Sequence, residues 1–379
     1  MMGGRMRIRH LAHAGLVAAA FSLGLASGAG AANVSGRVVT TNGVGIPNID
    51  IDVIDRVTGV TLDILDDDTD TDGSFDFLVP DGRYLVRFEA VNGEPLVSLE
   101  FEDWLLQGVV NWTVPMEVGV FLSGTVRGPS AQAVANADVR LFRHDLESSV
   151  HIPDDETTAS GTFTVVAPQG TALTLTVKPP SGNDFLGLET EVPELSSALN
   201  VGTLTLESGH RVTGRVLSGG SGVERVNIDA FRSDGTPIPL GHDKTDATGA
   251  FEIVLPDGTF EILARPRGPN RLAATRSAPF SVSGDRSVGD LVVTPGVLLR
   301  GTVSDPNGDG VGDAQVTLTT PPAVSVDVTG GRANPAGYYE LVVATGVYDV
   351  TVSAPQYRNL RTSTIADYSL DGDAILDVP

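Results

Sequence analysis

Apolar and polar residues alternate along short stretches of the chain, and the same alternation returns several times. After Gly73, for example, apolar side chains fall at every second position and most of the residues between them are polar. A period of two is typical of a strand that buries one face in an antiparallel sheet, whereas a helix repeats every 3.6 residues. The apolar positions of three such stretches are Phe75, Phe77 and Val79, then Phe251, Ile253 and Leu255, then Tyr339, Leu341 and Val343. The pattern predicts strands throughout and no amphipathic helix.

Three series of glycines repeat along the chain and divide it into units. The first series is followed two residues later by an aromatic residue, and the second comes nine residues after the first. Both are spaced by 88 residues, while the third series, farther upstream, has spacings of 88, 90 and 87. The series are Gly73, Gly161, Gly249 and Gly337; Gly82, Gly170, Gly258 and Gly346; and Gly36, Gly124, Gly214 and Gly301. The repeat predicts four domains, at residues 32–118, 119–207, 208–295 and 296–379.

Each unit is expected to contain two hairpins. In the first unit, residues 36–40 lead through a glycine-rich turn into a strand at 49–53, and the second hairpin turns at Pro80-Asp81-Gly82. In the second unit the returning strand begins one residue out of phase, at Leu173, so a bulge or a longer turn is predicted there. Short strands and regular turns indicate an all-β sandwich. The linkers between units are short and apolar, which favours a semi-rigid rod of four beads.

The repeated residues resemble a known family. The clearest instances are Thr245-Asp246-Ala247-Thr248-Gly249-Ala250-Phe251 with Pro256-Asp257-Gly258-Thr259-Phe260, and Thr71-Asp72-Gly73-Ser74-Phe75 with Pro80-Asp81-Gly82-Arg83-Tyr84. These motifs are similar to those of the carboxypeptidase regulatory-like domain. The resemblance implies a transthyretin-like, or prealbumin-like, seven-stranded sandwich, and hence four tandem prealbumin-like (Ig-like) antiparallel β-sandwiches. It implies little about function, because this family is an accessory module of many secreted proteins, grouped with carbohydrate-binding-like sandwiches and bacterial adhesin repeats.

Composition narrows the class of protein. The 48 Asp and Glu residues outnumber the 25 Lys and Arg, and the formal net charge is -23. This balance argues against nucleic-acid binding, which needs clustered basic residues. The chain has no cysteine, which excludes disulfides, thiol catalysis and cysteine-zinc sites. A hydrophobic fraction of 41% is sufficient for packed cores.

Residues 1–31 have the pattern of a secretory signal peptide. Arginines at 5, 7 and 9 precede an apolar run from Gly15 to Ala26, and Ala29-Gly30-Ala31 resembles a cleavage site. The alternative is a short membrane anchor, but a span needs about 18 apolar residues and this run is shorter and interrupted. We expect an exported protein without a transmembrane segment in its mature chain. Its compartment is the periplasm, the cell surface or the extracellular space.

No motif predicts catalysis. His144-Asp145-Leu146-Glu147 matches a short zinc-binding pattern, but the other histidines are scattered and the motif ends a predicted strand. The mature chain has no Gly-x-Ser-x-Gly elbow, no phosphate-binding Gly-x-x-x-x-Gly-Lys loop and no cysteine nucleophile. The sequence therefore predicts no enzymatic activity and no catalytic or cofactor-binding residues.

Two acidic loops are candidates for a calcium site. The candidate ligands are Asp68, Asp70 and Asp72 in the first loop, and Asp305, Asn307, Asp309 and Asp313 in the second. Both loops contain Asp-x-(Asp or Asn)-x-Asp-Gly, in which alternate oxygens can converge on one hard cation. Neither has the bidentate glutamate of a complete calcium loop, since Val79 and Val316 stand at that position. A solvated turn is the alternative interpretation, and calcium is the one cofactor that the sequence suggests.

Trp104 and Trp112 lie in an insertion specific to the first unit, at residues 92–116. Exposed tryptophans stack on sugar rings, but packing into a core or into a seam between units is the interpretation that we favour.

The sequence thus predicts a non-catalytic secreted or cell-envelope protein that acts as a binding, adhesion or spacer module. Its expected partners are a cell-surface polysaccharide or an envelope protein, and not nucleic acid. Three alternatives remain: a carbohydrate-binding module protein, a calcium-binding structural stalk, and the accessory region of a secreted hydrolase.

Overall fold

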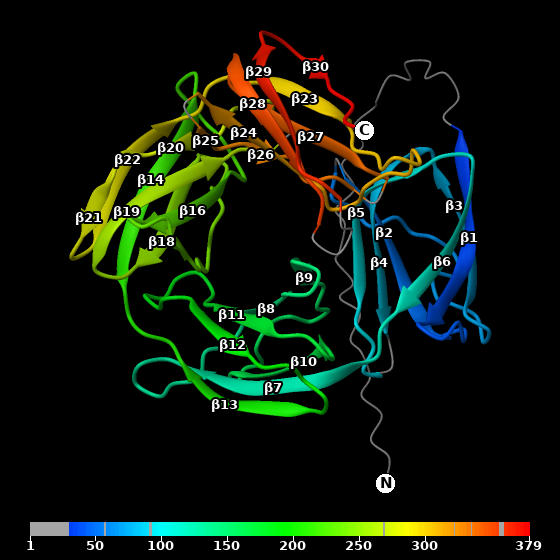
Figure 1. Cartoon of the computed structure of the whole chain (residues 1–379). Coiled ribbons are helices and arrows are strands. Elements are labelled where there is room, and N and C mark those ends of the chain that lie inside the picture. Colours follow the sequence, from blue (N-terminus) through cyan, green and yellow to red (C-terminus); the bar gives the residue numbers. More distant parts are fainter. Residues whose placement is uncertain are drawn as a thin grey trace, which may run out of the picture.

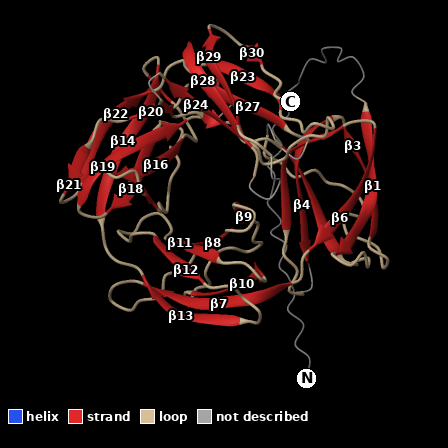
Figure 2. Ribbon diagram, in the orientation of Figure 1, coloured by secondary structure: helices blue, strands red, loops and turns tan. Residues whose placement is uncertain are grey.

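The computed structural model describes residues 30–379, except for 57, 91–92, 268–269, 322, 335 and 356–359. The signal peptide predicted at 1–31 lies outside the described residues apart from its last two positions. The described chain consists of β-strands joined by turns and loops (Figure 2), so the prediction of an all-β protein is confirmed. Within this part of the chain, no helix is long and apolar enough to cross a membrane.

The strands fall into four successive groups, each around its own hydrophobic core, which we call the first to fourth units. The first contains β1 (Ala31–Thr40), β2 (Ile49–Asp55), β3 (Ser74–Pro80), β4 (Gly82–Ala90), β5 (Leu99–Leu106) and β6 (Val109–Met116). The second contains β7 (Gly119–Arg127), β8 (Asp138–Arg143), β9 (Ser148–Val150), β10 (Thr162–Pro168), β11 (Leu173–Lys178), β12 (Leu188–Val192) and β13 (Leu199–Thr205). The third contains β14 (His210–Ser218), β15 (Ser221–Gly222), β16 (Asn227–Arg232), β17 (Pro237–Ile238), β18 (Ala250–Leu255), β19 (Gly258–Arg265), β20 (Thr275–Arg276), β21 (Phe280–Val282) and β22 (Arg286–Val292). The fourth contains β23 (Val297–Thr302), β24 (Gln315–Thr320), β25 (Val324–Val326), β26 (Thr329–Gly330), β27 (Tyr338–Val343), β28 (Gly346–Ser353), β29 (Ser363–Leu370) and β30 (Ala374–Ile375).

Two sheets enclose the core of each unit. In the first sheet the opening strand is central, with the orders β3-β1-β6, β10-β7-β13, β18-β14-β22 and β27-β23-β30. The second sheet is built around β2-β4-β5, β8-β11-β12, β16-β19 and β24-β28-β29. The opening strand is antiparallel to one neighbour but parallel to the closing strand of its unit, as β1 is to β6. The sandwiches are therefore mostly antiparallel, with one parallel pair in each that the sequence did not predict.

The two predicted hairpins are connections between sheets. β1 pairs with β3 and β6, whereas β2 pairs with β4 and β5. The turn at Pro80-Asp81-Gly82 therefore carries the chain from one sheet to the other, and the hairpin prediction was wrong. A strand with one buried face has the same alternation whether its successor lies beside it or across the core. The longer turn predicted in the second unit is present, since β10 ends at Pro168 and β11 begins at Leu173.

The repeated glycines have two physical causes. Gly73 and its three equivalents have φ between 75° and 83°, a left-handed conformation in which a side chain is strained. Gly214 has a different reason, because it lies opposite Phe251 and a Cβ there would be 2.5 Å from the phenyl ring. The glycine of the opening strand and the aromatic residue after the turn glycine are thus cross-strand partners, in this unit and in the other three.

The units follow one another in a closed curve, and the last lies beside the first (Figure 1). The Arg83 guanidinium of the first unit stands 4.2 Å from the centre of the Tyr338 ring of the fourth. The expectation of a rod was therefore wrong. Successive units contact each other through their second sheets, for example through Lys178 and Asp243, so the chain bends towards that side at each junction.

Candidate functional site

A buried threonine recurs at a spacing of 88 residues and fastens each of the first three units. Thr157 Oγ1 accepts a hydrogen bond from Ala137 N at 2.8 Å and donates one to Val134 O at 2.7 Å. Thr69 and Thr245 make the same two contacts in their own units. The fourth unit has Ala333 at this position. This threonine opens the motif that suggested the family, so its role is to hold two loop segments together.

The first unit shows that one sequence assignment was shifted. Thr69 and Asp70, and not Thr71 and Asp72, stand where Thr245 and Asp246 stand in the third unit. Thr69 is buried while Thr71 is exposed. Thr71 and Asp72 repeat the residue types of Thr69 and Asp70 two positions later, which made the wrong pair look like the motif.

The aspartate of the motif also serves the fold. Asp246 Oδ1 accepts hydrogen bonds from Thr248 Oγ1 at 2.7 Å, from Thr248 N at 2.8 Å and from Ala250 N at 3.0 Å. These bonds lower the pKa of the Asp246 carboxyl. Asn334 makes the equivalent backbone bonds in the fourth unit. A negative charge is therefore not required at the position of Asp246 and Asn334. The side chain at this position stabilises the turn through hydrogen bonds.

In the first loop predicted to bind calcium, the three candidate carboxylates differ in the contacts that they make. Asp72 Oδ1 accepts hydrogen bonds from Ser74 Oγ at 2.6 Å and Ser74 N at 3.0 Å, and these bonds lower the pKa of Asp72. Asp70 receives a longer bond of 3.5 Å from Ser74 Oγ. Asp68 lies away from them, in a bridge with Asp50 at the start of β2.

In the second loop predicted to bind calcium, the candidate carboxylates also differ in their contacts. Asp305 Oδ1 accepts hydrogen bonds from Asn307 N at 2.9 Å and Asp309 N at 3.0 Å, which closes the turn between β23 and β24. Asp313 forms an ion pair of 3.0 Å with Arg332. Among the described residues, no three His, Asp or Glu side chains come together in a way that would hold a metal ion. Calcium binding at these loops stays a prediction.

The least expected electrostatic feature is an acidic cluster on the second sheet of the first unit. It consists of Asp50, Asp52, Asp67, Asp68 and Glu89. Burial, together with the negative charges of the other four, raises the pKa of Asp50 to about 6. Burial and the charge of Glu89 also raise the pKa of Asp52. Sequence reasoning considered this acidic run only as a calcium loop, because Asp50 and Glu89 come from other strands.

A histidine of the second unit lies against this cluster. His151 Nε2 is 2.7 Å from Glu89 Oε1, and its Nδ1 is 3.5 Å from Glu100 Oε2. Arg87 pairs with the same Glu100 oxygen at 2.7 Å. The junction between the first two units therefore places one imidazole and one guanidinium against the acidic side chains.

Replacing Asp50 with asparagine is expected to stabilise the first unit at neutral pH. Because the folded state raises the Asp50 pKa from 3.8 to about 6, the carboxyl favours folding when protonated and this contribution is lost as the pH rises through that range. With allowance for solvent screening, we expect Asp50→Asn to gain about 1 kcal/mol at pH 7.5 and almost nothing at pH 3.5. Unfolding by urea at the two pH values measures this difference. The exposed Asp76, changed to asparagine, is the control and should give no pH-dependent gain; an equal gain would contradict the assignment.

The two tryptophans belong to the core of the first unit. Trp112 is buried, and its ring centre lies 4.2 Å from that of Trp104, which packs on Phe101 at 4.9 Å. The favoured interpretation of core packing is therefore confirmed. His144, the histidine of the short zinc-binding pattern, lies 2.8 Å from Thr174 Oγ1 and 3.6 Å from a carboxylate oxygen of Glu191.

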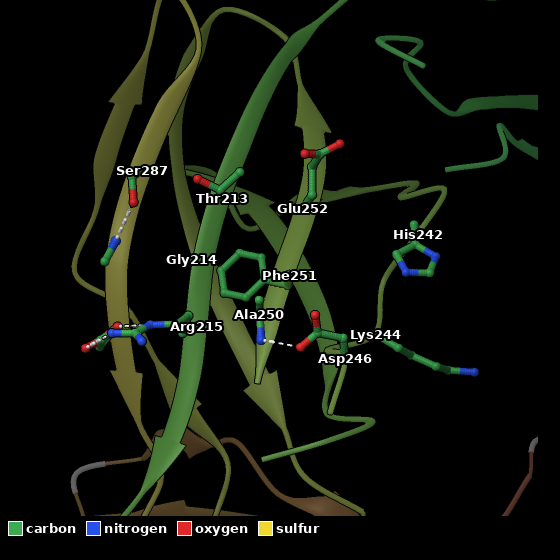
Figure 3. A pocket seen from close by; sticks show the side chains of 12 residues that line it. Thr213, Gly214, Arg215, His242, Lys244, Asp246, Ala250, Phe251, Glu252 and Ser287 are labelled. Atoms are coloured by element: carbon green, nitrogen blue, oxygen red, sulfur yellow. Dashed lines mark hydrogen bonds and ion pairs between the residues drawn. The ribbon is translucent and has the colours of Figure 1, made fainter. Parts of the chain in front are cut away.

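A shallow depression of about 620 Å³ lies on the third unit, over β14, β18 and β22 (Figure 3). Two of its carboxylates are in ion pairs: Glu252 pairs with Arg211 at 3.0 Å, and Asp290 pairs with Arg215 at 3.0 Å. The carboxylate of Asp246 accepts hydrogen bonds from Thr248 and Ala250. His242 and Lys244 lie on the segment beside β18 (Figure 3), and neither side chain forms a hydrogen bond or an ion pair within the described chain. Sequence reasoning missed this site, although Lys244 is one of only two lysines in the protein.

One segment of the chain matches a known protein family. Residues 299–371 match the family model of the carboxypeptidase regulatory-like domain. This segment is similar to that family. It runs from β23 to β29, so the carboxypeptidase regulatory-like domain coincides with the fourth unit. The resemblance noted from the motifs of the first and third units is thereby confirmed, although the match falls on the unit in which Ala333 and Asn334 replace the Thr-Asp pair.

Solved structures with similar folds come from bacterial proteins. The Bacillus anthracis TIE protein is 13% identical, with 94% of this chain and 75% of that chain covered and a TM-score of 0.21. The shaft pilin SpaA from Lactobacillus rhamnosus GG is 13% identical, with 47% and 98% covered and a TM-score of 0.20. BcpA, the major pilin subunit of Bacillus cereus, is 9% identical, with 70% and 99% covered and a TM-score of 0.21. At these scores the matches carry no information on function. No curated protein matches the chain in sequence.

Proposed function

We propose that this protein is a non-catalytic, exported scaffold of tandem carboxypeptidase regulatory-like sandwiches. It holds a fixed shape at the cell envelope and presents its loops to an envelope protein or a polysaccharide. We also propose that its domains have the boundaries 32–118, 119–207, 208–295 and 296–379, because each of the four cores lies within one of these ranges, except that Val97 of the first range packs into the second core.

The observation that carries this proposal is the polar contact at every junction. Arg143, whose side chain is only 10% exposed, reaches Glu117 of the preceding segment at 3.0 Å. Lys178 pairs with Asp243 at 3.1 Å across the second junction, and Arg276 pairs with Asp327 at 2.7 Å across the third. Partly buried ion pairs constrain geometry even where they add little stability. A protein that acts only as a spacer would not need ion pairs between its units. A scaffold that presents its loops in fixed positions does need them.

The test compares shape and binding in the same variants. X-ray scattering of the mature chain, from Ala32, should give the profile of a closed curve, and the chain should be retained by envelope extract or insoluble polysaccharide without hydrolysing it. Lys178→Met combined with Arg276→Met should open the curve and weaken retention at least threefold. Arg332→Met, which removes an ion pair within one unit, is the matched control.

Three outcomes would count against the scaffold. The first is unchanged retention by a double variant whose scattering shows an open chain. The second is turnover of a peptide or glycoside by the mature chain. The third is failure of the wild-type chain to bind any envelope fraction. Repeating the binding with calcium and with chelator tests the acidic loops, and a chelator effect that Asp305→Asn removes would establish the second loop as a calcium site.

A further inference from the structure

The outer edge of the first sheet is covered in the fourth unit, at β27, and open in the third unit, at β18. In the fourth unit, β26 lies along β27, with Thr329 opposite Val342 and Gly330 opposite Leu341. Gly331 N also donates a hydrogen bond of 2.9 Å to the carbonyl of Glu340. The outer edge of this first sheet is thus occupied by the protein's own chain.

The equivalent segment of the third unit is held by the neighbouring unit. Gly241 and His242 precede Thr329 and Gly330 by 88 residues, but they do not pair with β18. Gly241 packs so closely on the backbone of Pro179 that a Cβ would collide with it, and Asp243 is bound by Lys178 at 3.1 Å. The segment is thus held against the second unit and not along β18, and the depression of about 620 Å³ lies beside this strand (Figure 3).

The backbone of β18 is arranged to accept another strand. Gly249 O accepts a hydrogen bond from Val216 N, and Phe251 and Ile253 continue this alternate pairing with β14. In an antiparallel ladder, the residues between them direct their N–H and C=O groups to the other side. Glu252 and Val254 therefore present unpaired backbone groups along the open edge. An extended peptide can add to such an edge through main-chain hydrogen bonds.

Charge distinguishes this edge from those of the first two units. The residues that flank the equivalent edges are Asp66, Asp67 and Asp68 in the first unit, and Asp154, Asp155 and Glu156 in the second. In the third unit they are His242, Asp243 and Lys244, and Asp243 is neutralised by Lys178. Two carboxylates of the depression, Glu252 and Asp290, are paired with arginines, and Asp246 is turned to its own loop by hydrogen bonds from Thr248 and Ala250. The ammonium of Lys244 and the imidazole of His242 are left for a ligand. A peptide with acidic side chains fits this edge and would be repelled by the other two.

We propose that the edge of β18 is a strand-addition site for an extended, acidic peptide segment of a partner protein. The site rests on the proposed scaffold function and gives that function a defined docking position. The bound segment takes the place that β26 takes in the fourth unit, with a carboxylate against Lys244.

Fluorescence anisotropy with a labelled peptide tests this site on the whole mature chain. The probe is ten residues of alternating glutamate and threonine, and the comparison probe alternates lysine and threonine. The acidic probe should bind at least tenfold more tightly than the basic one. Val254→Pro removes an outward N–H without touching the pairing to β14, and it should weaken binding at least tenfold. Lys244→Glu, which copies the second unit, should weaken it at least threefold.

Val166→Pro is the matched control, since it makes the same change on the edge of β10 in the second unit, and it should leave binding within twofold. Unfolding curves show whether the proline variants remain folded, and Lys244→Glu keeps the test valid if they do not. Equal affinity of Lys244→Glu and wild type, or equal binding of the two probes, would overturn the proposal. Retention of Lys244→Glu on envelope material with loss of probe binding would leave the scaffold intact and show that this site is not its docking position.

Discussion

Replacing Gly161 with alanine is expected to cost the second unit about 3 kcal/mol of folding free energy. The φ of Gly161 is 75°, which costs roughly 1 kcal/mol for a residue with a side chain. The added Cβ would also lie 2.5 Å from the carbonyl oxygen of Val126. That strand cannot withdraw easily, because Val126 N donates a hydrogen bond of 2.7 Å to Gly161 O. Such overpacking adds roughly 2 kcal/mol to the backbone strain.

Gly202 provides the matched control for this variant. Its φ is also 75°, but a Cβ there would meet no atom within 4 Å. Gly202→Ala should therefore cost only about 1 kcal/mol, the strain term alone. Calorimetry of the whole chain, with hydrogen exchange of peptides from residues 119–207, measures both variants in the unit concerned. Equal losses would mean that conformation, and not the contact with β7, explains the repeated turn glycine.

The inward faces of the strands were predictable from sequence because burial follows a local pattern. Phe75, Phe77 and Val79 are all buried, as their alternation required. The pairing of strands was not predictable in the same way, because alternation records only which face is buried. Gly214 and Phe251 are an example. The glycines of the opening strands and the aromatic residues after the turn glycines both repeat in the sequence, but the repeat does not show that the two, 37 residues apart in this unit, are partners across one sheet.

The closed curve and the candidate site depend on contacts between units, for which the sequence has no local signal. Glu89 and His151 are 62 residues apart, and Lys178 and Asp243 are 65 residues apart. One signal was available, however, because aligning the repeats at 88 residues sets His242 and Lys244 against two runs of carboxylates. What the alignment lacked was the displacement of Gly241 towards the second unit, which follows from a tertiary contact.

The second large effect is expected at the buried threonine. Thr157→Val keeps the volume of the side chain but leaves Ala137 N and Val134 O without their partner in a buried site. Each unsatisfied backbone group costs about 1 to 2 kcal/mol, so a loss of roughly 2 to 4 kcal/mol is expected for the second unit. Hydrogen exchange of its peptides should show the loss. Thr164→Val, on the exposed face of β10, is the control and should change stability by less than about 0.5 kcal/mol.

The fourth unit permits the reciprocal experiment. Ala333 occupies the threonine position there, and the corresponding backbone groups are Ala314 N and Val311 O, because Ala333 O accepts from Asp313 N as Thr157 O accepts from Asn136 N. Ala333→Thr should place a hydroxyl between them and stabilise the fourth unit by about 1 kcal/mol, the net value of such hydrogen bonds. Calorimetry and hydrogen exchange of residues 296–379 measure the gain. A loss in Ala333→Thr would show that the fourth unit has no room for a side chain larger than alanine at this position. A loss in Thr157→Val together with a gain in Ala333→Thr would establish the hydroxyl as the group that fastens the loop to the second sheet.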